Sequence, residues 1–448
     1  MQDIRVYRVF LVFILIVTAS LMAQEYFLPE RPAASAITDV TVLPMTGTEI
    51  LEHQTVIIQG KDITAVGPAY EVDIPMDANR IDGSGRYLLP GLAEMHGHIP
   101  DPINSPEYTH SVLFLYLANG VTTVRGMLGE EGQLALRDRA NRGEILSPML
   151  FLAGPPFSGG SIDSPDQAEQ RVRRQQQDSW DYLKVLPGLT RAEYDAMSRA
   201  AKEVNIPWIG HVPEDVGLLH ALNMGQQTFD HIDGYIRYLD GADGPVDEEK
   251  LSNVIQRTKE SGAWIIPTMA VWETLMGAAP LGQVTGYREL NYLPPDIVEQ
   301  WTRSHRNRLN DPDFNPDRAQ RIVRNRMTIL NAMHQADVRI LFGTDSPQQF
   351  SVPGFSIHRE VQRMLDAGMP PHDILLTATR NVGEYVGEKA SLGTIEPGKL
   401  ANLLLLESNP LEEMNRLTDR AGVMIQGRWL PEKRIQAHLS ELAAGYGQ

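Results

Sequence analysis

Six residues of this 448-residue sequence have the chemical types and the spacing expected of a metal centre. His96 and His98 are separated by one residue at the end of an apolar run that begins at Tyr87. Side chains alternate faces along a strand, so residues i and i+2 point the same way. The pair can therefore direct two imidazoles at one point, which is a metal-ligand geometry. A His-x-His pair alone is a weak signal, and the residues downstream strengthen it.

Four further ionisable residues occupy other short apolar segments of the chain. They are Lys184, His211, His231 and Asp345. If these segments are parallel strands of a barrel, their carboxyl ends meet in one cup. Each residue alone would more often be a structural polar residue, but six of them on strand ends are hard to explain by packing. Zinc and similar divalent ions favour this mixture of imidazole and carboxylate.

Lys184 differs from the other five because an ammonium group is positively charged and offers no lone pair to a metal. A buried lysine beside cations loses its proton readily, and the neutral amine can take up CO₂ to form a carbamate. A carbamate presents two oxygens and could bridge two metal ions. The alternative is a lysine paired with a carboxylate, and the residue types alone do not choose between these two states.

The segments that carry these residues alternate with amphipathic helical stretches, such as those predicted over 191–204 and 319–336. The predicted strands are residues 87–98, 121–125, 149–153, 182–186, 207–211, 228–231, 264–268 and 339–345. Eightfold strand–helix alternation predicts an α/β fold, a (β/α)₈ TIM barrel, whose sites lie at the carboxyl ends of the strands. Residues 272–317 form a long insertion before the eighth strand, either a lid over the site or a decoration away from it.

Both ends of the chain have a different pattern from the middle. Residues 36–88 alternate short β-rich runs with turns and show no helical period, and residues 391–433 have the same character. We expect these two segments to pair in one sheet and to form a small, discontinuous β-sandwich domain. The barrel of residues 89–390 is then inserted between them.

The composition excludes several classes of function. The formal net charge of −17 argues against nucleic acid or anionic membrane surfaces as partners, although its simplest role is solubility. The absence of cysteine excludes disulfides, Cys-ligated zinc and thiol nucleophiles. A homo-oligomer is compatible with the sequence.

Residues 1–23 have the pattern of a secretory signal peptide. Arg5 and Arg8 precede a short apolar run that ends in small residues, and a membrane span needs about 20 apolar residues. We expect export to the periplasm or the cell exterior, with a mature N-terminus near Gln24. An uncleaved N-terminal membrane anchor is the alternative.

Six motifs together resemble the metal-dependent amidohydrolase superfamily, and within it the prolidase and imidazolonepropionase-like branch. They are residues 88–98, 182–185, 210–213, 230–234, 343–345 and 392–403. The resemblance implies a binuclear site, usually of zinc. Its ligands would be His96, His98 and Asp345 on one ion, His211 and His231 on the other, and a carbamylated Lys184 between the two.

The reaction implied by the resemblance is hydrolysis of an amide or peptide C–N bond, in Xaa-Pro-like dipeptides or N-acyl amino acids. Water activated by the metals attacks the carbonyl, and Asp345 passes the proton to the leaving amine. Arg125 and Tyr235 could donate hydrogen bonds to a substrate carboxylate. His358, in the segment after the last strand, could orient Asp345 or touch substrate. Each of these three could equally be a structural polar residue with local partners.

Two features depart from the pattern of the prolidase branch. Gly126 follows Arg125 where relatives often carry Asp, which puts one polar contact in doubt. His211 and Glu214 reproduce the His-x-x-Glu of mononuclear deaminases in the same superfamily. A deaminase or a cyclic-amide hydrolase is therefore the alternative, but a deaminase has no use for a bridging Lys184. A binding scaffold without catalysis is disfavoured because all six ligand positions are filled.

Overall fold

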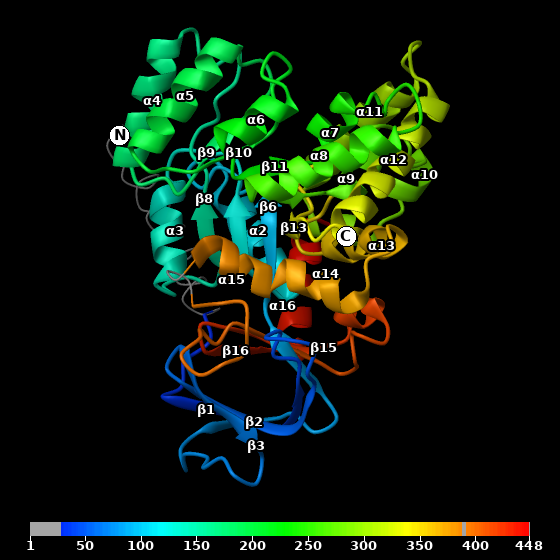
Figure 1. The fold of residues 1–448 in the computed structure, drawn as a ribbon. Helices are drawn as coiled ribbons and strands as arrows, with labels where there is room; N and C mark the ends of the chain where they lie inside the picture. Colours follow the sequence, from blue (N-terminus) through cyan, green and yellow to red (C-terminus); the bar gives the residue numbers. More distant parts are fainter. Residues whose placement is uncertain (1–27, 388–390, 448) are drawn as a thin grey trace, which may run out of the picture.

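The computed structural model of the protein describes residues 28–387 and 391–447, and the predicted signal peptide lies outside them. Within these ranges no helix combines the length and apolar character that crossing a bilayer requires. Figure 1 shows a β region built from the two ends of the chain, below a larger region of alternating strands and helices.

The β region is one mixed sheet. Its strands are β1 (Ala34–Val42), β2 (Leu51–Gln59), β3 (Asp62–Pro68), β4 (Asn79–Asp82), β5 (Tyr87–Pro90), β14 (Leu403–Leu406), β15 (Arg420–Ile425) and β16 (Arg428–Pro431). The order is β16-β15-β14-β5-β1-β2-β3, with β4 beside β1. The prediction that both chain ends pair in one sheet is confirmed by the antiparallel β5–β14 pair. Because β5 also pairs with β1, the strands form one continuous sheet instead of the two separate sheets expected of a sandwich.

The α/β region contains every strand predicted for a barrel. These strands are β6 (Leu92–Gly97), β7 (Val121–Gly126), β8 (Met149–Leu152), β9 (Leu183–Val185), β10 (Trp208–Gly210), β11 (Thr228–Asp230), β12 (Trp264–Ile266) and β13 (Arg339–Ile340). They form two parallel sheets, β6-β7-β8 and β13-β12-β11-β10-β9. Residue bridges Ala153–Tyr182 and Phe157–Val185 link β8 to β9. On the other side, the Met95 amide donates to the Phe342 carbonyl over 2.9 Å.

Helices follow the strands and cover them. In the α/β region they are α2 (Pro106–Ala118), α3 (Gln133–Asn141), α4 (Pro165–Gln177), α5 (Arg191–Glu203), α6 (Leu218–Met224), α7 (Asp233–Tyr238), α8 (Glu248–Ser261), α12 (Pro316–Gln335), α13 (Ser356–Asp366), α14 (Pro371–Ala378) and α15 (Arg380–Val386). The two predicted helices are confirmed as α5 and α12. Helix α5 begins with a capping box between Thr190 and Glu193, and α12 begins with an Asn315 cap followed by proline. Near the C-terminus lie η3 (Met414–Thr418) and α16 (Glu432–Gly445).

The long insertion folds into short helices that pack against the chain after Asp345. These are α9 (Met269–Leu275), α10 (Leu281–Val284), η1 (Arg288–Tyr292) and α11 (Pro295–Leu309). Tyr292 stacks on Phe355, and Trp301 meets Phe350 edge-on with ring centroids 5.9 Å apart. The insertion is therefore attached to the segment that follows a predicted metal ligand.

The stretch predicted as one strand over residues 87–98 is two strands that belong to different sheets. Strand β5 ends at Pro90, which has no N–H to continue a ladder, and β6 begins at Leu92. Gly91 between them lies against β7: a Cβ there would be 2.2 Å from Thr122 Oγ1 and 2.8 Å from Thr122 Cβ. The chain passes from one sheet to the other at this glycine.

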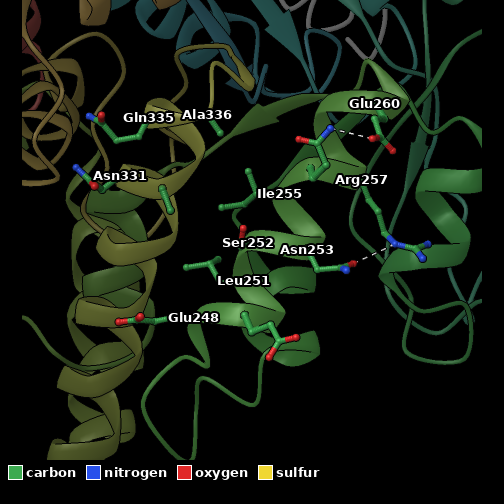
Figure 2. A pocket seen from close by; sticks show the side chains of 13 residues that line it. Glu248, Leu251, Ser252, Asn253, Ile255, Arg257, Glu260, Asn331, Gln335 and Ala336 are labelled. Carbon is green, nitrogen blue, oxygen red and sulfur yellow. Dashed lines mark hydrogen bonds between the residues drawn. The ribbon is translucent and has the colours of Figure 1, made fainter.

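A surface groove runs between α8 and α12 (Figure 2). Leu251 and Ile255 form its buried floor, and Glu248, Glu260 and Gln335 stand exposed on its rim. None of the 13 residues that line it is among the predicted site residues. The groove therefore does not coincide with the predicted metal centre.

We predict that Gly91→Ala destabilises the protein. The new Cβ meets the β-carbon of Thr122 as well as its hydroxyl, so no rotamer of Thr122 removes the clash. Overpacking of this kind costs about 1–3 kcal/mol of unfolding free energy. Chemical denaturation measures the loss, with Gly160→Ala as control because nothing lies within 4 Å of a Cβ at Gly160. Equal stability of the two variants would contradict the tight crossing at Gly91.

Candidate metal centre

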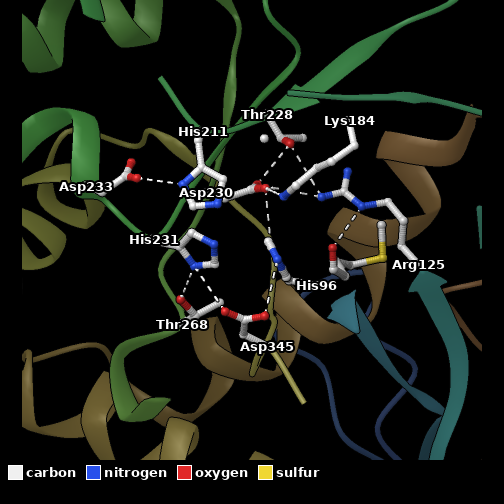
Figure 3. Close-up of polar contacts among 12 residues, drawn as sticks. His96, Arg125, Lys184, His211, Thr228, Asp230, His231, Asp233, Thr268 and Asp345 are labelled. Carbon is white, nitrogen blue, oxygen red and sulfur yellow. Dashed lines mark hydrogen bonds and ion pairs between the residues drawn. The ribbon is translucent and has the colours of Figure 1, made fainter. Parts of the chain in front are cut away.

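Three of the predicted ligands form the buried middle of the centre. His96 lies near the end of β6, while His231 and Asp345 follow β11 and β13 (Figure 3). One potential ligand atom from each of the three lies within 4.8 Å of the others. All three are buried, and both His231 and Asp345 have left-handed backbone conformations, with φ of 65° and 61°. Such conformations in residues other than glycine concentrate at functional sites.

Two more predicted ligands surround this trio. His98 Nε2 lies 2.6 Å from Asp345 Oδ1, and the His211 ring centroid is 4.7 Å from that of His231. The side chains of His98 and His211 are 20% and 16% exposed, so they lie at the outer edge of the centre. The fold thus brings three predicted imidazoles, those of His96, His98 and His231, to the Asp345 carboxylate, and it places His211 beside His231.

Lys184 is also at the centre, where it forms an ion pair with Asp230. Its Nζ donates to Asp230 Oδ2 over 2.7 Å, and the same oxygen lies 3.3 Å from His96 Nδ1. Burial acts to raise the pKa of Asp230, but the neighbouring Lys184 and His96 lower it by more, so the pKa lies well below its ordinary value. Of the two states that the sequence left open for Lys184, this structure contains the lysine–carboxylate pair.

Arg125 lies behind this ion pair, completely buried. Its Nε donates to the Met95 carbonyl over 2.8 Å, and one terminal nitrogen donates to the Tyr385 hydroxyl over 2.6 Å. Its other terminal nitrogen is 4.0 Å from Asp230 Oδ1. Arg125 therefore connects the backbone beside His96 to the strand that carries Asp230, and these donors are engaged with the protein itself.

The other two predicted substrate contacts have neighbours outside the metal cluster. The Tyr235 hydroxyl lies 2.8 Å from Thr258 Oγ1 on α8. His358 is partly buried in α13, and burial, with Arg420 nearby, lowers its pKa to about 3. Roles for these residues and for Arg125 in substrate binding stay predictions.

Two residues that sequence reasoning missed orient the histidines. Asp233 Oδ2 lies 2.7 Å from His211 Nδ1, and Thr268 Oγ1 lies 2.7 Å from His231 Nδ1. Each contact occupies Nδ1 and leaves Nε2 for a metal, which is how outer partners orient histidine ligands. Asp233 was within reach of sequence reasoning, since it lies two residues after His231; Thr268 carries no such signal.

Glu94 is a third missed residue, and its signal was a charged residue inside an apolar strand. Its carboxylate accepts hydrogen bonds from the amides of His96 and Thr344, at 3.0 and 2.8 Å, and from the Thr344 hydroxyl at 2.5 Å. Burial raises the pKa of Glu94 to about 8 against the effect of these donors. Glu94 thereby joins β6 to the segment that carries Asp345.

The residues present fit a divalent cation. Burial, with Lys184 nearby, lowers the pKa of His96 to about 4, and burial lowers the pKa of His231 well below its ordinary value. Both imidazoles are therefore neutral at pH 7 and have a lone pair to offer. His96 Nδ1 is buried and makes no well-aligned hydrogen bond among the described residues, although it lies 3.3 Å from Asp230 Oδ2. Neutral imidazoles beside a carboxylate are the ligand set that zinc-like ions favour.

A family model, the amidohydrolase family, matches residues 87–430, which is more than half of the chain. The chain belongs to the amidohydrolase family. This assignment agrees with the superfamily resemblance of its motifs and with a buried metal site on an α/β fold.

Curated relatives and solved structures show which amidohydrolases resemble this one. The adenine deaminase of Rubrobacter xylanophilus is 22% identical over 418 residues, which cover 90% of this chain and 59% of the deaminase. The adenine deaminase of Ruegeria sp. is 20% identical over 403 residues, which cover 85% of this chain and 56% of the deaminase. The chain thus spans less than two thirds of the length of these relatives.

The solved structures similar to this chain include peptidases. A Xaa-Pro dipeptidase with bound methionine has a TM-score of 0.67 at 19% identity, covering 89% of this chain and 100% of that one. A putative prolidase from Bifidobacterium longum has a TM-score of 0.69 at 22% identity, and the match covers 92% of this chain and 100% of the prolidase. Bottromycin amidohydrolase has a TM-score of 0.75 at 20% identity, and the match covers 95% of this chain and 93% of that one. At these identities the likeness establishes the shared fold.

We predict that Thr268→Val weakens metal binding about 10–100-fold, because the variant keeps the side-chain shape but removes the oxygen that orients His231. Competition with a chelator measures the affinity. Thr258→Val is the matched control: it removes an equally buried hydroxyl that contacts Tyr235 instead of the cluster. If both variants bind metal like the parent protein, Thr268 does not orient a ligand.

Proposed function

We propose that this amidohydrolase is a metal-dependent hydrolase that cleaves the amide C–N bond of an Xaa-Pro-like dipeptide or an N-acyl amino acid. The observation that carries the proposal is Lys184, which is buried against the histidine cluster through Asp230. A lysine in that place suits a carbamate bridge, so we assign two divalent ions, zinc by ligand type, to the centre. We also infer that the two parallel sheets are arcs of one (β/α)₈ barrel, since backbone contacts link both of their edges.

Asp345 is the residue suited to move the proton. Its Oδ1 lies 2.6 Å from His98 Nε2. Burial acts to raise the pKa of Asp345, but the neighbouring His96 and His98 lower it by more, so the pKa lies below its ordinary value. The carboxylate is therefore ionised at pH 7 and can accept a proton from water and deliver it to the leaving amine. Divalent ions held there would act as Lewis acids and lower the pKa of water.

The carbamate on Lys184 would form in two steps: the ammonium first loses a proton to solvent and leaves its ion pair, and the neutral amine then attacks CO₂ with loss of a second proton. The departure of Lys184 would strand Asp230 as a buried anion. Arg125 lies 4.0 Å from Asp230 Oδ1 and supplies a cation that stays. This charge arrangement supports the carbamate state, because Asp230 keeps a positive partner when the lysine becomes anionic.

Adenine deamination is the second candidate, because curated relatives are named adenine deaminases. Two observations favour hydrolysis. Glu214, the acid of the His-x-x-Glu pattern, is exposed after β10, whereas the metal cluster is buried. Lys184 is buried at the cluster, where a mononuclear deaminase needs no lysine.

Parallel assays of zinc-loaded protein separate the two candidates. We expect free amine from a panel of Xaa-Pro dipeptides and N-acyl amino acids, and no ammonia from adenine. Ammonia release from adenine, with no hydrolysis of any amide in the panel, would reverse the assignment.

We predict that Lys184→Ala loses metal and turnover together, and that short carboxylic acids in solution restore part of both. A small acid can enter the vacated space and supply the two bridging oxygens. Metal content by elemental analysis and amide hydrolysis with and without added acetate or propionate are the measurements.

Lys184→Arg is the matched variant, because it keeps a cation beside Asp230 but cannot be carbamylated. It should fold and stay inactive with or without added acid. If Lys184→Ala retains full metal content and full activity per folded molecule, the lysine has no bridging role.

We propose further that the protein is exported through its N-terminal segment, on the pattern of Arg5, Arg8 and the apolar run that follows. N-terminal sequencing of protein from a periplasmic or culture fraction should begin near Gln24. An intact Met1 in the membrane fraction would favour the anchor instead.

A further inference from the structure

Trp272 places an indole ring against one of the metal ligands. It lies on α9, four residues after Thr268, whose hydroxyl contacts His231 Nδ1. The ring centroids of Trp272 and His231 are 5.6 Å apart, and the ring planes are inclined at 48°. The helix that follows β12 therefore orients His231 and also lays a large flat side chain beside it.

Arg326 supports the indole from a second direction. This residue of α12 is 1% exposed, and its guanidinium carbon lies 4.8 Å from the centroid of the Trp272 ring. One terminal nitrogen of Arg326 donates to the Pro267 carbonyl over 2.9 Å, which ties it to the residue before Thr268. A guanidinium over an indole face is an attractive contact. The ring orientation is therefore constrained by a buried and hydrogen-bonded partner.

The indole nitrogen of Trp272 is not engaged with the rest of the described protein. Trp272 Nε1 is buried and has no hydrogen-bond partner among the described residues. A buried indole N–H ordinarily finds an acceptor, and phenylalanine or leucine would avoid the unmet donor. What tryptophan adds here is the extent of its flat apolar surface beside His231.

The residues around the cluster that are exposed to solvent indicate where a substrate would contact the indole of Trp272. His96, His231 and Asp345 are at most 3% exposed, so a substrate meets them through their neighbours. The neighbours that retain exposure include His98, His211, Asp233 and the half-buried Trp272. Of these four, Trp272 is the apolar one.

We propose that Trp272 is a specificity-determining residue that binds a flat apolar group, preferably aromatic, next to the bond that reacts. The ring of such a group packs on the indole while the polar end meets the metal cluster. Aromatic pairs prefer offset or edge-on contacts with centroids about 4.5–7 Å apart, which the indole can offer to a ligand beside His231. The proposal refines the substrate class of the proposed hydrolase, but the ligand contact itself does not require hydrolysis.

Hydroxamic acids test the contact through binding, since they chelate divalent metals, and an assay for released hydroxylamine checks that they are not turned over. Calorimetry on zinc-loaded full-length protein gives the affinities of benzohydroxamic and acetohydroxamic acid. We expect the preference for the benzo compound to fall about tenfold or more in Trp272→Leu, which stays apolar but loses the flat face. Trp272→Phe keeps a flat ring and should keep most of the preference.

Trp180→Leu is the matched control, since Trp180 is another half-buried indole but precedes β9, at the opposite end of the strands from the cluster. It should bind both acids like the parent protein. A benzo-to-aceto ratio in Trp272→Leu within twofold of the parent ratio would overturn the proposal.

Failure of the proposed function gives a different result. If no amide is hydrolysed yet the hydroxamate preference depends on Trp272, the proposed reaction is wrong and the binding role stands. If the parent protein and Trp272→Leu both hydrolyse amides, with the same preference for aromatic over small aliphatic substrates, the reaction stands and the role of Trp272 is wrong.

Discussion

The buried carboxylate of Asp230 is the group around which the candidate metal centre is arranged. Asp230 accepts from Lys184 over 2.7 Å, lies 3.3 Å from His96 and has Arg125 at 4.0 Å. A carboxylate removed from water is costly unless it is paired and hydrogen bonded. The anion therefore requires cations from β9 and β7, and it draws the end of β6 towards β11. An Asp230 left without any cation beside it would be an uncompensated buried charge, at about 3–5 kcal/mol.

Around this carboxylate, the ligands are positioned by residues that never need to touch substrate. Glu94 joins β6 to the segment of Asp345 through three hydrogen bonds, and Asp233 and Thr268 each occupy Nδ1 of one histidine. Ligands oriented in advance lose little entropy when a cation binds. Burial keeps the histidines neutral. It also means that a substrate would first contact the residues at the outer edge of the centre, which include Trp272 beside His231.

The residues that gather at the candidate centre and the strands that precede them could be predicted from the sequence, because short apolar runs ending in His or Asp form a pattern that a barrel explains; their role as metal ligands stays a prediction. The contacts of Asp230 and Thr268 could not be predicted, because a polar residue at a strand end gives the same sequence pattern whether it pairs with a distant side chain or faces solvent. The sequence left Arg125 open between a substrate contact and a structural polar residue; in the structure two of its nitrogens donate to Met95 and Tyr385, and the substrate role stays a prediction. The crossing at Gly91 depends on Thr122, a contact between strands that no local pattern encodes.

Anomalous X-ray scattering at the zinc edge, from crystals grown with zinc and bicarbonate, shows whether Lys184 bridges two metal ions. We expect two anomalous peaks among His96, His211, His231 and Asp345, with electron density for a carbamate on Lys184 between them and Asp230 turned towards Arg125. Crystals without an anomalous peak near His96, in which Lys184 remains paired with Asp230, would contradict the bridging role of Lys184.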